Sequence, residues 1–142
     1  MTSDCVFCRI IAGESPCEAI VEDAASLAFM DINPAHDGHC LVIPKAHFAT
    51  VIEMPPDAFG AVAAAAAKVA RAIDAELRPD GLSLVQANGA PAGQTVFHLH
   101  IHVLPRVAGD ALPLNWARGG AGGGDRRRIA EIAGRLRARL RG

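Results

Sequence analysis

Three histidines alternate with aliphatic residues in the segment 98–102, which reads HLHIH. Successive side chains of a β-strand point to opposite faces of a sheet, so His98, His100 and His102 would share one face of a strand. In a helix the same residues would scatter imidazoles and aliphatics around the axis. The alternation therefore predicts a strand with three imidazoles on an exposed face and apolar residues turned to a core. Those apolar residues are Phe97, Leu99, Ile101 and Val103.

The overall composition is that of an ordinary globular protein, with 51% hydrophobic and 20% charged residues. A chain of 142 residues can bury a core, and we predict a single domain over residues 1–142. No apolar run approaches the roughly 20 residues that span a bilayer, and the first residues lack the basic start of a signal peptide. We therefore expect a cytoplasmic protein with reduced thiols and no membrane contact.

The C-terminal segment 118–142 is basic, with eight arginines against two acids. Such a tail is one mark of nucleic-acid binding. Here, however, the arginines alternate with aliphatic residues from Ile129 to Leu140, as on the solvated side of an amphipathic helix. We predict a Gly-rich hinge over 119–124, then a helix capped by Asp125, and no nucleic-acid partner.

The rest of the chain predicts an α+β fold, with a meandering antiparallel sheet of about five strands and helices against it. A short helix lies between Asp4 and Gly13, and a long Ala-rich helix covers 57–78, with Asp57 as its N-cap. The predicted strands are 18–22, 27–31, 39–45, 82–87 and the histidine segment.

The histidines themselves suggest two kinds of chemistry. Three imidazoles can bind zinc, but the outer two lie ~13 Å apart on a strand and cannot easily share one ion. A division of tasks fits better, because one histidine can attack phosphorus while a neighbour binds phosphate or protonates the leaving group.

Cys5 and Cys8 form a Cys-x-x-Cys pair, which serves either as half a zinc site or as a redox pair. The zinc reading needs two further ligands, and the six histidines are the candidates. His47 follows a predicted strand end, and His36 and His39 lie close to it in sequence. The other two cysteines, Cys17 and Cys40, are isolated and fit packing roles.

The loop 88–95 precedes the histidines and carries amide and hydroxyl side chains among glycines. Exposed backbone N–H groups and such side chains suit an anionic oxygen. By itself the segment fits an ordinary glycine turn, and only its position next to the histidines favours an oxyanion or phosphate site.

Several motifs in order resemble the histidine triad (HIT) family of nucleotide hydrolases and transferases. Residues 98–104 match the family signature of three alternating histidines followed by two apolar residues. Residues 5–14 (CVFCRIIAGE), 29–34 (FMDINP) and 38–47 (GHCLVIPKAH) are similar to its phosphoramidase (Hint-like) branch, and 93–96 (GQTV) precede the triad as in the family.

The resemblance implies a HIT-like fold, a homodimer with a sheet continuous across its interface, and a purine nucleotide substrate. By this resemblance, His100 attacks the α-phosphate to form a nucleotidyl-histidine intermediate, and His102 contacts phosphate and assists the leaving group. It also implies binding roles for the remaining site residues. Asn88, Gln94 and Thr95 would hold phosphate oxygens, Asp31 the ribose hydroxyls, and Ile32 with Phe7 or Ile10 the base.

Bacterial members of this branch that carry the N-terminal cysteine pair bind a structural zinc ion. The resemblance implies Cys5, Cys8, His47 and His98 as its ligands. His98 would then serve the zinc, while His100 and His102 serve the phosphate. The motifs around 93–96 and 103–106 are equally similar to the dinucleoside-polyphosphate hydrolase (Fhit-like) branch.

These observations leave three hypotheses for function. The favoured one is a hydrolase of purine nucleoside phosphoramidates or nucleotidyl conjugates, with diadenosine polyphosphates as the alternative substrates. The second is a regulatory module that binds nucleotide without depending on turnover. The third is a redox or metal-transfer protein that works through Cys5 and Cys8.

Overall fold

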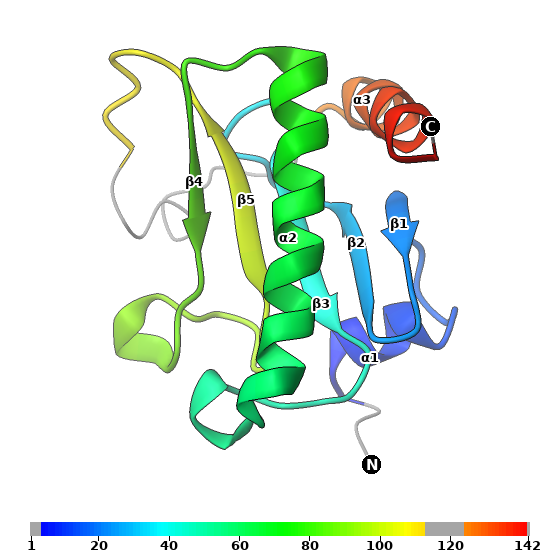
Figure 1. Cartoon of the computed structure of the whole chain (residues 1–142), viewed down its shortest axis with the longest axis vertical. Helices are drawn as coiled ribbons and strands as arrows, with labels where there is room; N and C mark the ends of the chain where they lie inside the picture. The colour runs from blue at the N-terminus through cyan, green and yellow to red at the C-terminus, as the bar shows by residue number, and fades with distance from the viewer. Residues whose placement is uncertain (1–3, 113–123, 142) are drawn as a thin grey trace.

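Five antiparallel strands form one sheet in the order β1-β2-β3-β5-β4 (Figure 1). The computed structural model of the chain describes residues 4–112 and 124–141. Its strands are β1 (Ala19–Glu22), β2 (Ser26–Met30), β3 (Cys40–Pro44), β4 (Gly81–Val85) and β5 (Ile101–Arg106). Its helices are α1 (Val6–Ile11), α2 (Pro56–Leu77) and α3 (Arg126–Arg141), with short 3₁₀ turns η1 (Val51–Glu53) and η2 (Ala90–Ala92). The predicted α+β class and antiparallel sheet are confirmed.

Strands β2 and β3 are buried along their whole length because both faces of the sheet are covered. Helices α2 and α3 cover one face, and α1 lies on the other (Figure 1). Alternate residues divide between the two faces, as the strand period requires. The α2 side takes Ala28, Met30, Cys40 and Val42, and the α1 side takes Leu27, Phe29, Leu41 and Ile43.

Helix α2 packs a stripe of small and aliphatic residues onto the sheet, with Val62, Val69 and Ile73 buried. The helix begins at Pro56, where a missing N–H costs nothing, and Pro55 is its N-cap. The predicted cap at Asp57 is therefore wrong by two residues, since Asp57 lies in the first turn.

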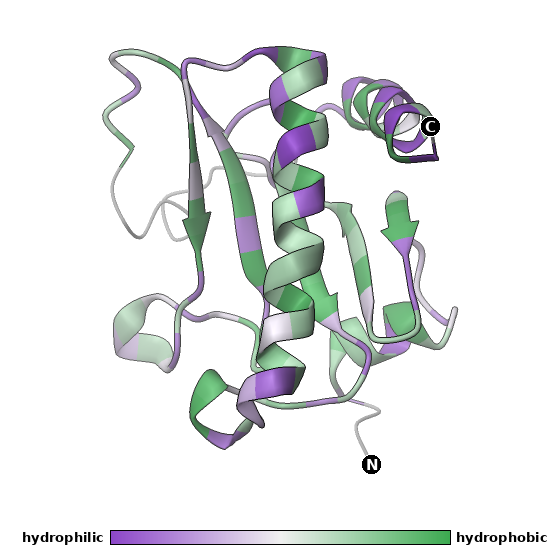
Figure 2. Cartoon of the chain, viewed as in Figure 1, coloured by the Kyte–Doolittle hydropathy of each residue, from purple (hydrophilic) through white to green (hydrophobic). Residues whose placement is uncertain are grey.

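Helix α3 is amphipathic as predicted, with hydrophobic (green) and hydrophilic (purple) residues in alternation along it (Figure 2). The Asp125 carboxylate accepts the N–H groups of Arg127 and Arg128, so Asp125 caps the helix. Arg135 and Arg139 both bind Glu76 of α2, which fastens the two helices together. The predicted hinge, except Gly124, lies outside the described residues. None of the helices in the described part of the chain is long and apolar enough to cross a membrane.

The histidine segment enters the sheet later than predicted, because β5 begins at Ile101. Strand β3 ends at Pro44, which has no N–H for a ladder, and the N–H of Leu99 donates to Phe48 O instead (2.7 Å). The predicted alternation nevertheless holds for the core, where Leu99, Ile101 and Val103 are buried. Phe97 is an exception, since half of it is exposed.

Candidate functional site: a cysteine-histidine cluster beside a histidine cavity

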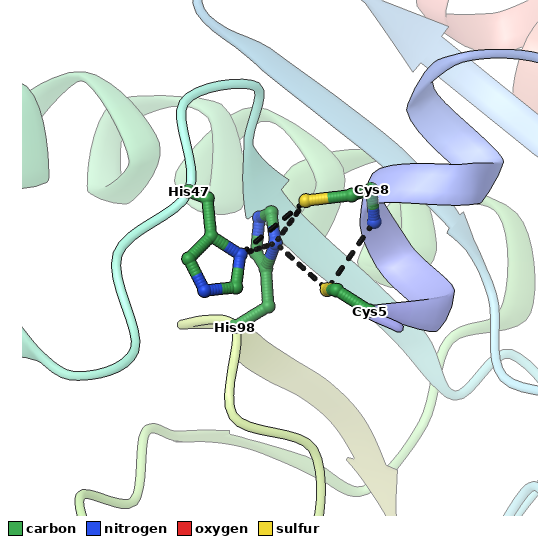
Figure 3. Close-up of side chains that lie close together, drawn as sticks. All are labelled: Cys5, Cys8, His47 and His98. Atoms are coloured by element: carbon green, nitrogen blue, oxygen red, sulfur yellow. Dashed lines mark hydrogen bonds between the residues drawn. The ribbon is translucent and has the colours of Figure 1, made fainter. Parts of the chain in front are cut away.

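Four potential metal ligands lie close together on the α1 face of the sheet: Cys5, Cys8, His47 and His98 (Figure 3). The Sγ atoms of Cys5 and Cys8 lie 3.4 and 3.5 Å from His98 Nδ1. His47 Nδ1 lies 3.3 Å from Cys8 Sγ and 3.1 Å from His98 Nδ1. Four atoms able to bind a metal, from segments far apart in the sequence, thus lie within 4.8 Å of one another.

Local structure presents both cysteines on the same side of α1. Cys5 is the N-cap of this helix, and its Sγ accepts the N–H of Cys8 at 3.3 Å. One helical turn therefore separates the two sulfurs and points them in the same direction. The histidines come from the adjacent ends of two paired strands, His47 just after β3 and His98 just before β5.

The tautomer of His98 suits metal binding. Its Nε2–H donates to Pro44 O at 2.8 Å, which leaves the lone pair of Nδ1 facing the cysteines. Burial lowers the pKa of His98 and favours the neutral, ligating form. In a tetrahedral zinc site with two sulfur and two nitrogen ligands, neighbouring ligand atoms lie roughly 3.3–3.8 Å apart. The three sulfur–nitrogen distances of 3.3–3.5 Å fall in this range, and the two nitrogens, 3.1 Å apart, lie slightly closer.

A cavity of about 530 Å³ opens on the same face of the sheet. One wall is apolar and is formed by α1 with the neighbouring strands. The polar side chains that line the cavity include His100, His102, Asp31 and Thr95. The apolar wall includes Val6, Phe7, Ile10, Phe29 and Leu41, and the rim includes Ile32, Pro34 and Leu112.

His100 is held as a potential nucleophile. Its Nδ1–H donates to the backbone oxygen of His98 at 2.8 Å, which fixes the ring and leaves the Nε2 lone pair unprotonated. The side chain is almost wholly buried, and burial lowers its pKa, so the ring is neutral near pH 7. The exposed imidazole face expected from the sequence is therefore wrong, since His98 and His100 are buried.

His39 was one of the histidines open as a ligand for the cysteine pair, and it lies outside that cluster. It lies instead beside His102 and Asp31, with 2.9 Å between His39 Nε2 and His102 Nδ1. His39 Nδ1 accepts the N–H of Ala35 at 3.1 Å, so its own proton is on Nε2 and is directed at His102. His102 Nδ1 is then an acceptor, and the proton of a neutral His102 lies on Nε2. No spacing in the sequence signals this bond, because 63 residues separate the partners.

Burial dominates the electrostatics of this histidine pair. Burial, together with smaller contributions from neighbouring imidazoles, lowers the pKa of His39 to about 4 and that of His102 to about 3. The Asp31 carboxylate lies 3.5 Å from His39 Nε2 and acts in the opposite direction on the pKa of His102. Both rings are thus neutral near pH 7.

The loop before the histidines has a different arrangement from the one expected. The amide of Gln94 is buried, and it binds Gly89 N–H, Ala49 O and Val96 O. Asn88 binds the N–H of Val51 and exchanges two hydrogen bonds with Gln86. Both amides therefore hold the loop in shape, and Thr95 is the expected phosphate-binding residue of this loop that lines the cavity.

Phe7 connects the cavity with the cysteine-histidine cluster, which is formed by Cys5, Cys8, His47 and His98. Its ring makes edge contacts with His98 and His100, at centroid distances of 5.8 and 5.3 Å, and with Phe29 at 5.5 Å. Phe7 lies between Cys5 and Cys8 in α1, so the element that supplies both sulfurs also supplies a wall of the cavity.

Comparison with known proteins identifies the family. Residues 12–109 match the model of the HIT domain, so the chain belongs to the HIT family. It is 44% identical over 117 residues (82% of this chain) to "Adenylylsulfatase HINT3" of Arabidopsis thaliana, although the match spans only 58% of that protein. It is 40% identical over 102 residues (72% of this chain, 74% of the relative) to "Adenosine 5'-monophosphoramidase hnt1" of Schizosaccharomyces pombe. A solved zinc-bound histidine triad family protein from Mycobacterium smegmatis has a TM-score of 0.84 and 38% identity, covering 99% of this chain and 96% of that one.

Proposed function

We propose that this protein hydrolyses conjugates of a purine nucleoside monophosphate at the α-phosphate, with a phosphoramidate as the preferred substrate. The observation that carries the proposal is the unprotonated Nε2 of His100 at a nucleotide-sized cavity, held by the bond from Nδ1–H to His98 O. The names of the two enzyme relatives support the class of reaction, since one cleaves an adenylyl sulfate and the other an adenosine phosphoramidate.

The proposed reaction has two displacements at phosphorus. His100 Nε2 donates its lone pair to the α-phosphorus while the bond to the leaving group breaks, giving a nucleotidyl-histidine. The Nε2–H of His102, which His39 keeps in the required tautomer, donates a hydrogen bond to the leaving nitrogen, which takes its proton from solvent, so His102 stays neutral. Water then attacks the phosphorus, His100 leaves with its electron pair, and the proton of that water passes to solvent.

The cavity suggests how the nucleotide is held. The base would lie against Phe7, Ile10 and Ile32, and the ribose hydroxyls would donate to the Asp31 carboxylate. The Thr95 hydroxyl would donate to a phosphate oxygen. We assign Asn88 and Gln94 an indirect role, because their side chains shape the loop that presents Thr95.

We also propose that Cys5, Cys8, His47 and His98 bind one zinc ion. The donor set, the ligand spacing and the name of the zinc-bound relative support this assignment. All four tetrahedral positions are taken by protein, so the ion would fix structure and would leave no place for a reacting water.

The edge strand β4 supports a homodimer. Within the described residues this strand pairs with β5 alone, and Leu84, next to its last residue, is 53% exposed. An unprotected apolar edge is the kind of surface that a second copy covers by antiparallel pairing.

Replacement of His100 tests the proposed reaction. We expect His100→Asn to reduce hydrolysis of an adenosine 5′-phosphoramidate by about 10³-fold or more, because the nucleophile is lost, while binding of AMP persists. Mass spectrometry of the wild-type protein should trap one nucleotidyl group, absent from the variant. Full activity in the variant would overturn the mechanism. Rates on diadenosine tri- and tetraphosphate that exceed the phosphoramidate rate would favour the alternative substrate.

A further inference from the structure

Asp110 is a nearly buried carboxylate in the turn that follows β5, with its side chain only 7% exposed. Arg106, at the end of β5, binds it with two parallel hydrogen bonds of 2.6 and 2.7 Å. The same carboxylate accepts the N–H groups of Val107 and Leu112 at 3.2 and 3.3 Å. Asp110 thus binds both ends of the turn from Val107 to Leu112 and connects this turn to Arg106 at the end of β5.

His36 supplies the remaining donor. Its Nε2 lies 3.1 Å from Asp110 Oδ2, across 74 residues of sequence. The Arg106 guanidinium holds the pKa of the Asp110 carboxyl well below its usual range, so the carboxylate is charged at any working pH. His36 binds this carboxylate from the loop that carries Asp31 at one end and His39 at the other.

The backbone next to Asp110 is strained. Ala111 has a φ of +50°, a left-handed conformation that a residue with a Cβ rarely adopts. This conformation brings the Leu112 N–H back to Asp110 Oδ1, and Leu112 lines the nucleotide cavity. Strain of this kind persists only where the surrounding contacts enforce it.

We propose that Asp110 is a positioning residue for nucleotide binding, acting through Leu112 and His36. It fixes Leu112 as a wall of the cavity and, through His36, fastens that wall to the loop between Asp31 and His39. This role rests on the proposed function only in that the cavity binds a nucleotide. None of these three residues touches the reacting atoms in the proposed mechanism.

A pair of substitutions at His36 separates the hydrogen bond from the bulk of the ring. His36→Phe keeps the bulk and removes the donor, whereas His36→Gln supplies an amide N–H at a similar distance. We expect His36→Phe to raise the KM for adenosine 5′-phosphoramidate and the Kd for AMP about fivefold, with kcat within about twofold of wild type. His36→Gln should restore both constants to near the wild-type values.

Asp110→Asn removes the negative charge that accepts hydrogen bonds from Arg106, His36 and two backbone N–H groups. It should raise the KM for adenosine 5′-phosphoramidate and the Kd for AMP by about tenfold or more. The matched control is Asp37→Asn, which breaks the exposed ion pair of the same loop with Arg128 and should leave both constants unchanged. Partial unfolding would lower kcat by reducing the active fraction and would leave KM unchanged. Should Asp110→Asn fail to fold, the His36 pair decides the question.

Binding of AMP by calorimetry keeps the two proposals distinguishable. If the wild-type protein hydrolyses the phosphoramidate but His36→Phe equals Asp37→Asn in KM and Kd, the positioning role is wrong and the proposed reaction stands. If the wild-type protein binds AMP without hydrolysing conjugates, the proposed reaction is wrong, and the calorimetric comparison still decides the role of Asp110.

Discussion

Backbone carbonyl groups determine which nitrogen of each central histidine is available. Pro44 O accepts a hydrogen bond from His98 Nε2–H, which leaves Nδ1 facing the cysteines, whereas His98 O accepts one from His100 Nδ1–H, which leaves Nε2 as the unprotonated nitrogen. Two imidazoles just before β5 thus present different nitrogens to their surroundings. His98 takes part in both arrangements, since its side chain joins the cluster of Cys5, Cys8 and His47 and its carbonyl orients His100.

The buried histidines make folding sensitive to acid. In an unfolded chain, an imidazole has a pKa near 6.5, whereas in the folded protein the pKa of His39 is about 4 and that of His102 about 3. Between pH 6.5 and 4 the unfolded chain binds more protons, so the free energy of unfolding falls as the pH falls. Each group contributes up to about 1.4 kcal/mol per pH unit in this window and nothing above it.

Urea unfolding at pH 7, 6 and 5 measures this dependence. We expect His39→Phe to unfold more easily at every pH, because the Ala35 N–H loses its acceptor, but with a shallower dependence on pH since one titrating group is gone. A wild-type protein that is equally stable at pH 7 and pH 5 would contradict the burial of neutral imidazoles.

Helix α1 depends on its side chains for its place in the fold. A helix of six residues is too short to be stable alone in water. The helix is held by Phe7, which is buried against Phe29, and by Cys5 and Cys8, which lie against His47 and His98. The same helix forms the apolar wall of the cavity. Binding of zinc by the cysteine-histidine cluster and affinity for nucleotide should therefore be coupled.

Metal removal tests this coupling. We expect one zinc per chain by elemental analysis, lost after chelation or in Cys8→Ser. The metal-free protein should melt roughly 5 °C lower or more and bind AMP at least several-fold more weakly, because α1 loosens.

Cys17→Ser is the matched control, since Cys17 lies outside the cluster and its variant should keep the metal. A metal-free protein with unchanged melting and AMP affinity would contradict the coupling. A protein purified without zinc, with a readily formed bond between Cys5 and Cys8, would favour the redox hypothesis instead.

At the level of elements, local patterns predicted more than long-range contacts. Alternation predicted that Leu99, Ile101 and Val103 enter the core, and helical spacing predicted α2 and α3. The start of β5 was missed, because it depends on Pro44 in another strand. The bond from His39 to His102 and the one from His36 to Asp110 join segments more than sixty residues apart, and no local propensity encodes them.

The whole molecule uses the two faces of one sheet for different purposes. Helices α2 and α3 close a hydrophobic core on one face. The other face carries α1, the cysteine-histidine cluster and the cavity. The exposed edge at β4 is separate from both, so assembly through that edge leaves the cavity face uncovered.

A homodimer should form by antiparallel pairing of β4 with its copy, which would join two five-stranded sheets into one. We expect sedimentation of the wild-type protein to give a dimer at micromolar concentration. Leu84→Lys places a charge on that edge and should give a monomer, because a lysine on an edge strand opposes pairing. Ala24→Lys, which adds the same charge in the turn between β1 and β2 at the opposite edge, should leave the dimer intact. A monomeric wild-type protein would show that no such interface forms, and a Leu84→Lys variant that stays dimeric would place the interface elsewhere.

Since the cavity lies within one chain, the Leu84→Lys monomer should retain binding of AMP.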